Sequence, residues 1–96
     1  MTEKLSITHI EQQMSTVSGW TLAGDTIHRT IRLRSFPAAI AFITEAGFLA
    51  EAANHHPDID IRWRNVTLTL TTHEAGGLTQ KDFDLAARIN TLISGN

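Results

Sequence analysis

The sequence predicts an α+β fold in which a four-stranded antiparallel sheet carries helices packed on one face. Segments with the apolar period of a helix alternate with segments that have the two-residue period of a strand, in the order α-β-β-α-β-β-α. Turn signals at Gly24-Asp25 and Arg64-Asn65 separate the two strands of each pair. Two strand pairs with helices before, between and after them are typical of a sheet covered by a helical layer.

Length and composition indicate one globular domain that spans residues 1–96. The hydrophobic content of 42% and the charged content of 19% are ordinary for a folded protein. A chain of 96 residues closes a single hydrophobic core. Because so small a domain buries a modest share of its surface, we expect the chain to form a homodimer or a homotetramer.

Charge and cysteine content exclude several classes of protein. The net charge is −2 and the lysines and arginines form no cluster, so neither nucleic acid nor a membrane surface is an expected partner. The N-terminus lacks a long apolar run, and the absence of cysteine excludes disulfides and thiolate chemistry. We therefore expect a cytoplasmic protein.

The first third of the chain predicts a short helix and two strands. Apolar residues recur every three or four positions from 6 to 17, and Thr8 with Glu11 forms a candidate capping box. A brief strand begins at Trp20, which is expected in the core. Residues 26–34 then alternate between an apolar face and a basic polar face, as in a half-buried strand.

A long helix is predicted after the Ser35 cap, with Pro37 in its first turn, where a missing N–H costs nothing. This helix is apolar around most of its circumference, so we expect it to be the buried central one. Pro57 ends it, because proline disfavours the helical conformation of the residue before it. The last helix begins at a capping box formed by Thr79 and Asp82.

The two strands after Pro57 predict a specific register. Their apolar residues alternate with polar ones, and a slip by one residue would set isoleucine against threonine. A two-residue connection at Arg64-Asn65 matches the two apolar faces. The resulting pairs are Trp63 with Val66, Ile61 with Leu68 and Ile59 with Leu70. Extended backwards, this register places His56 opposite His73.

Three histidines are predicted to meet around one pocket. His55 follows Glu51 by four residues, so the carboxylate and the imidazole share a helix face and the carboxylate can orient the ring. The chain changes direction at Pro57, so His55 and His56 should point to different sides of one cavity, with His73 across from them. The expected rim residues are Thr71, Thr72 and Glu74.

This arrangement favours acid/base chemistry over a metal site. Imidazole titrates near neutrality and can both give and take protons. The histidines with Glu51 or Asp58 would suffice in number for zinc or iron, but adjacent histidines in a turn are not the usual i, i+4 pair. We therefore expect no metal. The other two histidines, His9 and His28, are expected at the surface.

The same region carries a family resemblance. The stretch E-x-x-x-H-H-P at 51–57 and the stretch T-L-T-L-T-T-H-E-A-G-G-L-T at 67–79, followed by Asp82, resemble the pterin-4a-carbinolamine dehydratase family. The similarity extends over nearly the whole chain, from the first helix and the Gly19-Trp20 pair to the last helix. A double histidine alone would be a weak motif, whereas the combined spacing is specific.

The resemblance implies the removal of water from a 4a-hydroxytetrahydropterin to give the quinonoid dihydropterin. This step supports tetrahydropterin recycling and needs neither a metal nor an organic cofactor. The family's histidines fall on His55, His56 and His73; we expect His55 and His73 to transfer protons and His56 to position the ring. The expected substrate-binding residues are Glu51, Pro57, Thr72, Glu74 and Asp82.

The sequence also departs from the family pattern. Asn54 stands where the animal enzymes carry aspartate, and Ile59 stands where many members carry tryptophan, which leaves the preferred pterin side chain open. Animal members also serve as dimerisation cofactors of a homeodomain transcription factor, a role that is not implied here. The competing hypothesis is a non-catalytic pterin-binding or protein-interaction module, with residues 66–72 adding to a partner's sheet if that strand lies at an edge.

Overall fold

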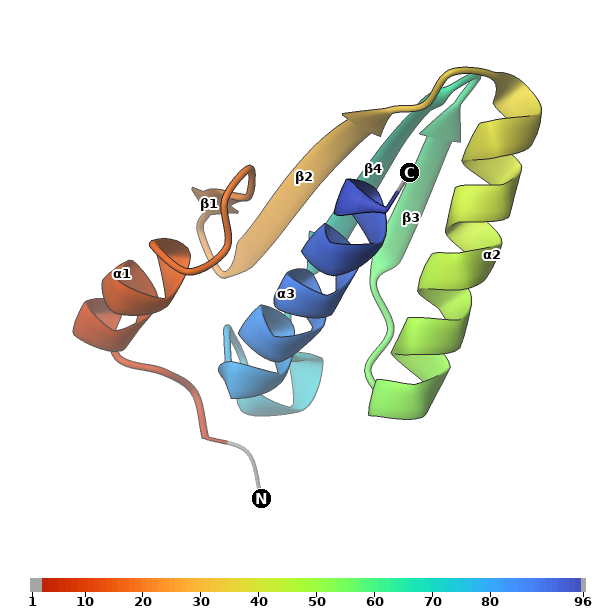
Figure 1. Ribbon diagram of the computed structural model, residues 1–96. Coiled ribbons are helices and arrows are strands. Elements are labelled where there is room, and N and C mark those ends of the chain that lie inside the picture. The colour runs from red at the N-terminus through yellow and green to blue at the C-terminus, as the bar shows by residue number, and fades with distance from the viewer. Residues whose placement is uncertain (1–2, 96) are drawn as a thin grey trace.

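The computed structural model describes residues 3–95 and has the predicted α+β architecture (Figure 1). The sheet is antiparallel with the strand order β1-β2-β4-β3, so β4 lies inside the sheet and is not an edge that a partner could extend. The elements are α1 Ile7–Met14, β1 Thr21–Ala23, β2 Thr26–Arg32, α2 Phe36–Ala53, β3 Asp58–Arg62, β4 Asn65–Leu70, the 3-10 turn η1 His73–Ala75, and α3 Gln80–Ser94.

The helices cover one face of the sheet, and the core lies between the two layers (Figure 1). Alternate residues of β2 and β4 supply its floor, because successive strand side chains point to opposite faces. Trp20 is buried as predicted, and its indole N–H donates to the Asn90 side chain at 2.8 Å. The buried strand residues are Ile27, Ile31, Val66, Leu68 and Leu70, and the buried hydrophobic residues of α3 are Phe83, Leu85, Ala86 and Ile89.

The β3–β4 hairpin has a register two residues away from the predicted one. Ile61 lies opposite Val66 and Ile59 opposite Leu68, so the strands connect through Trp63 and Arg64. A shift of two keeps each side chain on its predicted face. Trp63 does not extend the apolar face: it takes a left-handed φ of 60° in the turn and is 79% exposed.

The first helix begins at a different cap from the predicted one. The Ser6 hydroxyl accepts a hydrogen bond from the His9 N–H at 3.2 Å, which makes Ser6 the N-cap and displaces the predicted Thr8–Glu11 capping box. The helix ends at Met14, and Val17 is buried in the turn that follows it. A serine side chain can satisfy an N-terminal N–H as well as a threonine can, so composition alone left the choice of cap ambiguous.

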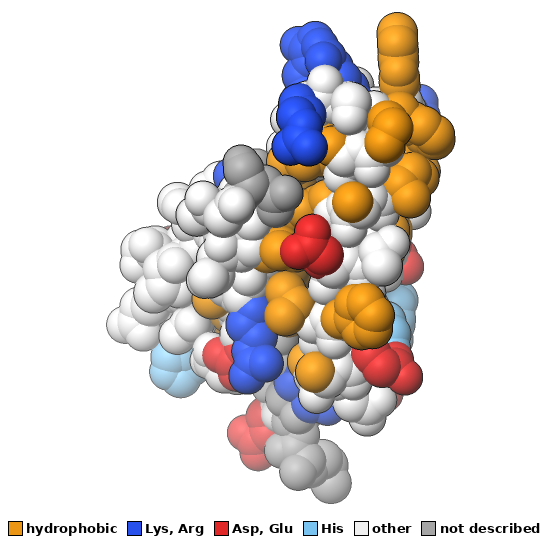
Figure 2. Space-filling view, turned by 45° about the vertical axis from the view of Figure 1, so that its right-hand side comes forward, with side chains coloured by type: hydrophobic (Ala, Val, Ile, Leu, Met, Phe, Trp, Pro, Cys, Tyr) orange, Lys and Arg blue, Asp and Glu red, His pale blue; other side chains and the backbone are white. Residues whose placement is uncertain are grey.

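The central helix α2 is less buried than predicted. Its alanine-rich side faces the core, whereas Phe48 is 74% exposed and Phe36 and Ile40 are also exposed on the outward side. Figure 2 shows hydrophobic side chains gathered along this outward side. The helix α2 is long and apolar enough to cross a membrane, but the core helices of soluble proteins meet the same criteria of length and composition.

Candidate functional site

The end of α2 positions two adjacent histidines. Asn54 caps the helix in the left-handed conformation, with φ 49° and ψ 43°, which asparagine tolerates better than most residues. The His55 N–H then donates back to the Ala50 carbonyl at 3.1 Å. The chain therefore leaves the helix abruptly, and the His55 and His56 side chains find different partners.

His55 is held by a buried carboxylate of α3. Its Nε2 lies 2.5 Å from Oδ1 of Asp82, and the two residues are 8% and 0% exposed. The predicted partner of His55 was Glu51, but Glu51 instead bonds Nε2 of His56 at 2.8 Å. The left-handed turn at Asn54 ends the helical spacing before His55, so the i, i+4 relation does not apply.

Asp82 joins a buried hydrogen-bond network with two threonines. Its Oδ2 accepts hydrogen bonds from the Thr72 hydroxyl at 2.8 Å and from the Thr79 N–H at 2.9 Å. The second of these bonds is the carboxylate half of the predicted capping box at the start of α3. One carboxylate therefore both caps a helix and anchors a histidine.

His73 approaches from a loop that the sheet holds closed. It begins the turn η1 directly after Thr72, whose backbone forms an isolated antiparallel bridge with Gly77. Gly76 ends the turn with φ 75°, a conformation that glycine adopts without strain. The His73 side chain is exposed and has no bonded partner among residues 3–95, so its imidazole is available to a ligand.

The three histidines line one cavity of about 200 Å³, together with Asn54, Thr71 and Glu74. The predicted meeting of His55, His56 and His73 is therefore observed, although the register that suggested it was wrong by two residues. The remaining residues named from the sequence lie outside this lining. Glu51 contacts His56 from behind, Thr72 and Asp82 are buried behind His55, and Pro57 follows the two histidines.

The hydrogen bond to Asp82 decides which nitrogen of His55 can exchange a proton. A carboxylate only accepts hydrogen bonds, so Nε2 of His55 carries the hydrogen that it donates to Asp82. This leaves Nδ1 as the free nitrogen of a ring that lines the cavity. His73 offers a second imidazole on the same cavity. Two imidazoles facing one small cavity can take a proton from one atom of a ligand and give a proton to another.

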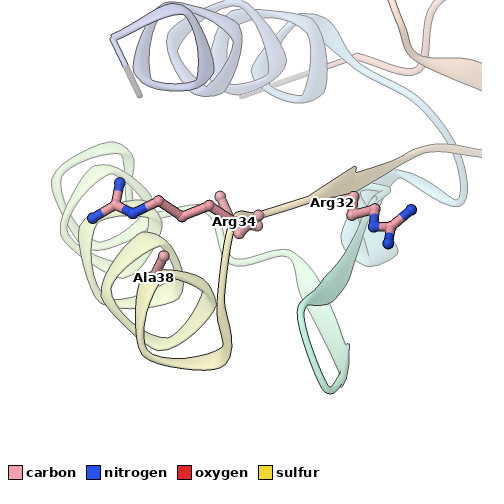
Figure 3. A pocket seen from close by; sticks show the side chains of 4 residues that line it. Arg32, Arg34 and Ala38 are labelled. Atoms are coloured by element: carbon pink, nitrogen blue, oxygen red, sulfur yellow. The ribbon is translucent and has the colours of Figure 1, made fainter.

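Two larger hollows lie at the other end of α2 and lack this chemistry. They share Arg32 and Arg34, have volumes of about 350 and 880 Å³, and contain no histidine or carboxylate. Figure 3 shows the smaller one, where the side chains of Arg32 and Arg34 point away from each other and Arg34 lies over α2 near Ala38. Because arginine stays charged, these hollows offer no group that titrates near neutrality.

Sequence reasoning missed part of the site and its support. Thr79 was recognised only as a helix cap, although its hydroxyl also bonds the Thr72 hydroxyl at 2.8 Å. In the sequence, only the presence of Thr72 and Thr79 pointed to this contact, and it becomes predictable once the end of the strand and the start of the helix are known to lie together.

Among residues 3–95, no group of three or more His, Cys, Asp or Glu side chains is arranged to hold a metal ion.

Comparisons with known proteins place this chain in a family. The family model described as pterin 4 alpha carbinolamine dehydratase matches residues 3–92. A relative from Roseiflexus sp. (strain RS-1), named "Putative pterin-4-alpha-carbinolamine dehydratase", is 59% identical over 97% of this chain and 100% of its own. A relative of the same name from Nocardia farcinica is 54% identical over 95% of this chain and 96% of its own.

A solved structure agrees with the sequence comparisons. The crystal structure of a transcriptional coactivator/pterin dehydratase from Brucella melitensis superposes with a TM-score of 0.89 and 26% identity, covering 94% of this chain and 98% of that one. This chain belongs to the pterin 4 alpha carbinolamine dehydratase family.

Proposed function

We propose that this chain is a cytoplasmic, single-domain enzyme that dehydrates a 4a-hydroxytetrahydropterin to the quinonoid dihydropterin and thereby supports tetrahydropterin recycling. The observation that carries the proposal is the meeting of three histidines around one cavity, with the His55 ring held by the buried Asp82 carboxylate. Family membership suggests the substrate class, and the cavity supplies groups that can exchange protons.

The reaction requires one proton to be given and one to be taken. The bond between C4a and the hydroxyl oxygen breaks, N5 loses its proton, and a C4a–N5 double bond forms. An imidazolium gives a proton to the departing hydroxyl, which leaves as water, and a neutral imidazole takes the proton from N5. His55 and His73 are the proposed pair, because they come from different elements and line the same cavity.

The other residues named from the sequence receive supporting roles. His56 and Glu74 line the cavity and are proposed to hold the pterin ring, with Pro57 fixing the turn that presents His56. Thr72 and Asp82 were expected to bind substrate directly. Since both are buried, we assign them an action through His55 instead.

A spectroscopic assay tests this function. Chemically generated 4a-hydroxytetrahydropterin is mixed with the protein, and formation of the quinonoid product is followed by its ultraviolet spectrum. We expect the protein to accelerate dehydration well above the rate in buffer at the same pH. A folded protein that leaves the rate unchanged would contradict the proposed activity.

A second candidate function has one observation in its favour. The Brucella melitensis protein is named as a transcriptional coactivator as well as a pterin dehydratase, which suggests a protein-interaction module. In that case the histidine cavity would bind a pterin without turning it over. Binding of the product pterin without any dehydration, measured by calorimetry on the same sample, would favour this alternative.

Glu51 provides a prediction with a small expected effect. The Glu51 and His56 side chains are 80% and 60% exposed, and an exposed ion pair contributes little to stability. We expect Glu51→Gln to change the free energy of unfolding by less than about 0.5 kcal/mol and kcat by less than about threefold. Urea unfolding and steady-state kinetics measure both. A loss of a hundredfold in kcat would assign Glu51 a direct part in the chemistry.

We also propose that the chain self-associates through the outward side of α2. A helix that is apolar all round is normally covered on all sides, yet Phe36, Ile40 and Phe48 of α2 are exposed. The gathered hydrophobic side chains in Figure 2 would be buried between two copies. This supports the homodimer or homotetramer expected from the size of the chain.

A charge placed on that side of α2 tests the self-association. We expect Phe48→Glu to shift the protein towards its monomer mass of 10.6 kDa in sedimentation velocity, because an unpaired carboxylate cannot be buried cheaply. Gln12→Glu adds the same charge at an exposed position of α1 and serves as the matched control. If both variants keep the mass of the unmodified protein, α2 is not the interface.

A further inference from the structure

Thr72 lies at the centre of the buried network behind His55. It is 3% exposed, and its two network neighbours, Thr79 and Asp82, have no exposed surface. The Thr72 hydroxyl contacts Oδ2 of Asp82 and the Thr79 hydroxyl, both at 2.8 Å. The Thr72 hydroxyl is therefore held between two buried side chains.

The directions of these hydrogen bonds follow from the number of protons. A threonine hydroxyl has one proton, and Thr72 donates its proton to the Asp82 carboxylate. The bond between the two threonines must therefore run from the Thr79 hydroxyl to the Thr72 oxygen. With Oδ2 of Asp82 held by Thr72 and by the Thr79 N–H, Oδ1 is turned towards His55. The hydroxyl of Thr72 thus fixes the rotation of the carboxylate that fixes the imidazole.

The backbone of the same residue closes the loop that carries His73. The Thr72 N–H donates to the Gly77 carbonyl at 3.1 Å, and the Gly77 N–H donates to the Thr72 carbonyl at 3.3 Å. The Ala75 N–H also donates to the Thr72 carbonyl, at 3.1 Å. The Thr72 side chain therefore bonds Asp82, which holds His55, and the Thr72 backbone bonds the loop that carries His73.

We propose that Thr72 is a positioning residue: its hydroxyl sets the orientation of the Asp82 carboxylate, and through it the placement of His55 relative to His73. Thr72 is not among the residues that line the cavity, so it acts on a bound pterin through its neighbours. This inference rests on the proposed function for its effect on turnover. Its effect on the His55–Asp82 hydrogen bond is independent of that function.

Thr72→Val removes the hydroxyl and keeps the branched shape. We expect kcat to fall about tenfold to a hundredfold, the factor that corresponds to one hydrogen bond to a charged group, with KM little changed. Proton NMR should show a shift of the His55 Nε2–H signal, because the carboxylate loses one of the two contacts that fix Oδ2. Thr72→Ser keeps the hydroxyl and should restore both readouts.

A matched control comes from the open face of the sheet. The hydroxyls of Thr30 and Thr67 bond each other at 2.8 Å away from the cavity, so Thr30→Val removes a hydroxyl of the same kind without touching the site. It should leave kcat and the NMR signal unchanged. If Thr72→Val does not fold, Thr72→Ala compared with Thr72→Ser gives the same contrast, since those two variants differ by the hydroxyl alone.

Two results would overturn the proposal. In the first, a folded Thr72→Val or Thr72→Ala variant keeps the NMR signal of the unmodified protein. In the second, Thr72→Ser shows the same losses as Thr72→Val although it keeps the hydroxyl, so the losses would not depend on the hydroxyl. If the unmodified protein shows no dehydration at all, the proposed function fails, but the NMR comparison still decides whether Thr72 orients Asp82.

Discussion

Replacing His55 with glutamine should lower kcat by about 10²- to 10⁴-fold, the usual contribution of a general acid or base. Glutamine is chosen because its amide N–H can still donate to Asp82 from nearly the same place as Nε2 of His55. The buried carboxylate then keeps a partner, and the variant should stay folded. What it loses is the ring nitrogen Nδ1, to which the proposed mechanism assigns the proton exchange. Steady-state dehydration, followed by ultraviolet absorbance, measures the loss.

The controls separate the chemistry from the fold. His9→Ala removes an exposed histidine of α1 that lines no part of the cavity and should keep full activity. His73→Ala should resemble His55→Gln in kcat, since the proposal gives each ring one proton transfer. A His55→Gln variant with nearly full turnover and unchanged thermal unfolding would remove His55 from the proposed pair.

Much of the fold could be predicted from periodicity, but the hairpin register could not. The apolar faces of β3 and β4 match equally well when the strands are shifted by two residues, since a shift of two preserves the side of every residue. Turn chemistry would normally break this tie. Here Trp63 occupies a left-handed position at which glycine or asparagine is usual, so the residue types did not indicate a turn at Trp63 and Arg64.

The residues of the candidate site could be predicted from the sequence better than the contacts between them. The helix end identified His55 and His56, the strand register suggested His73, and the three line one cavity. The bond from His55 to Asp82 joins residues 27 positions apart and depends on how α3 sits beside α2 and the end of β4. No local rule supplies such a contact. The left-handed backbone of Asn54 also makes His56 the partner of Glu51 in place of His55, because one non-helical residue changes the direction of the side chains that follow it.

Asp82→Asn should have the second large effect, although Asp82 does not itself line the cavity. The carboxylate accepts all of its hydrogen bonds, from His55, Thr72 and Thr79. An asparagine of the same shape must direct its NH₂ group at one of these donors. If its oxygen keeps the two threonine contacts, the NH₂ group faces His55 and forces the hydrogen of that ring from Nε2 to Nδ1. Nδ1, the ring nitrogen that is not bonded to Asp82, then donates where it previously accepted.

We therefore expect Asp82→Asn to lower kcat by about 10²-fold and to reduce the free energy of unfolding by about 1–3 kcal/mol, because neutral hydrogen bonds replace bonds to a charged acceptor. Nitrogen NMR of the His55 ring should show the protonated nitrogen changing from Nε2 to Nδ1. The double variant Asp82→Asn, His55→Gln should be no slower than the slower single variant, because Asp82 acts through His55. Multiplied losses in the double variant would mean that Asp82 contributes to the reaction by a route that bypasses the imidazole.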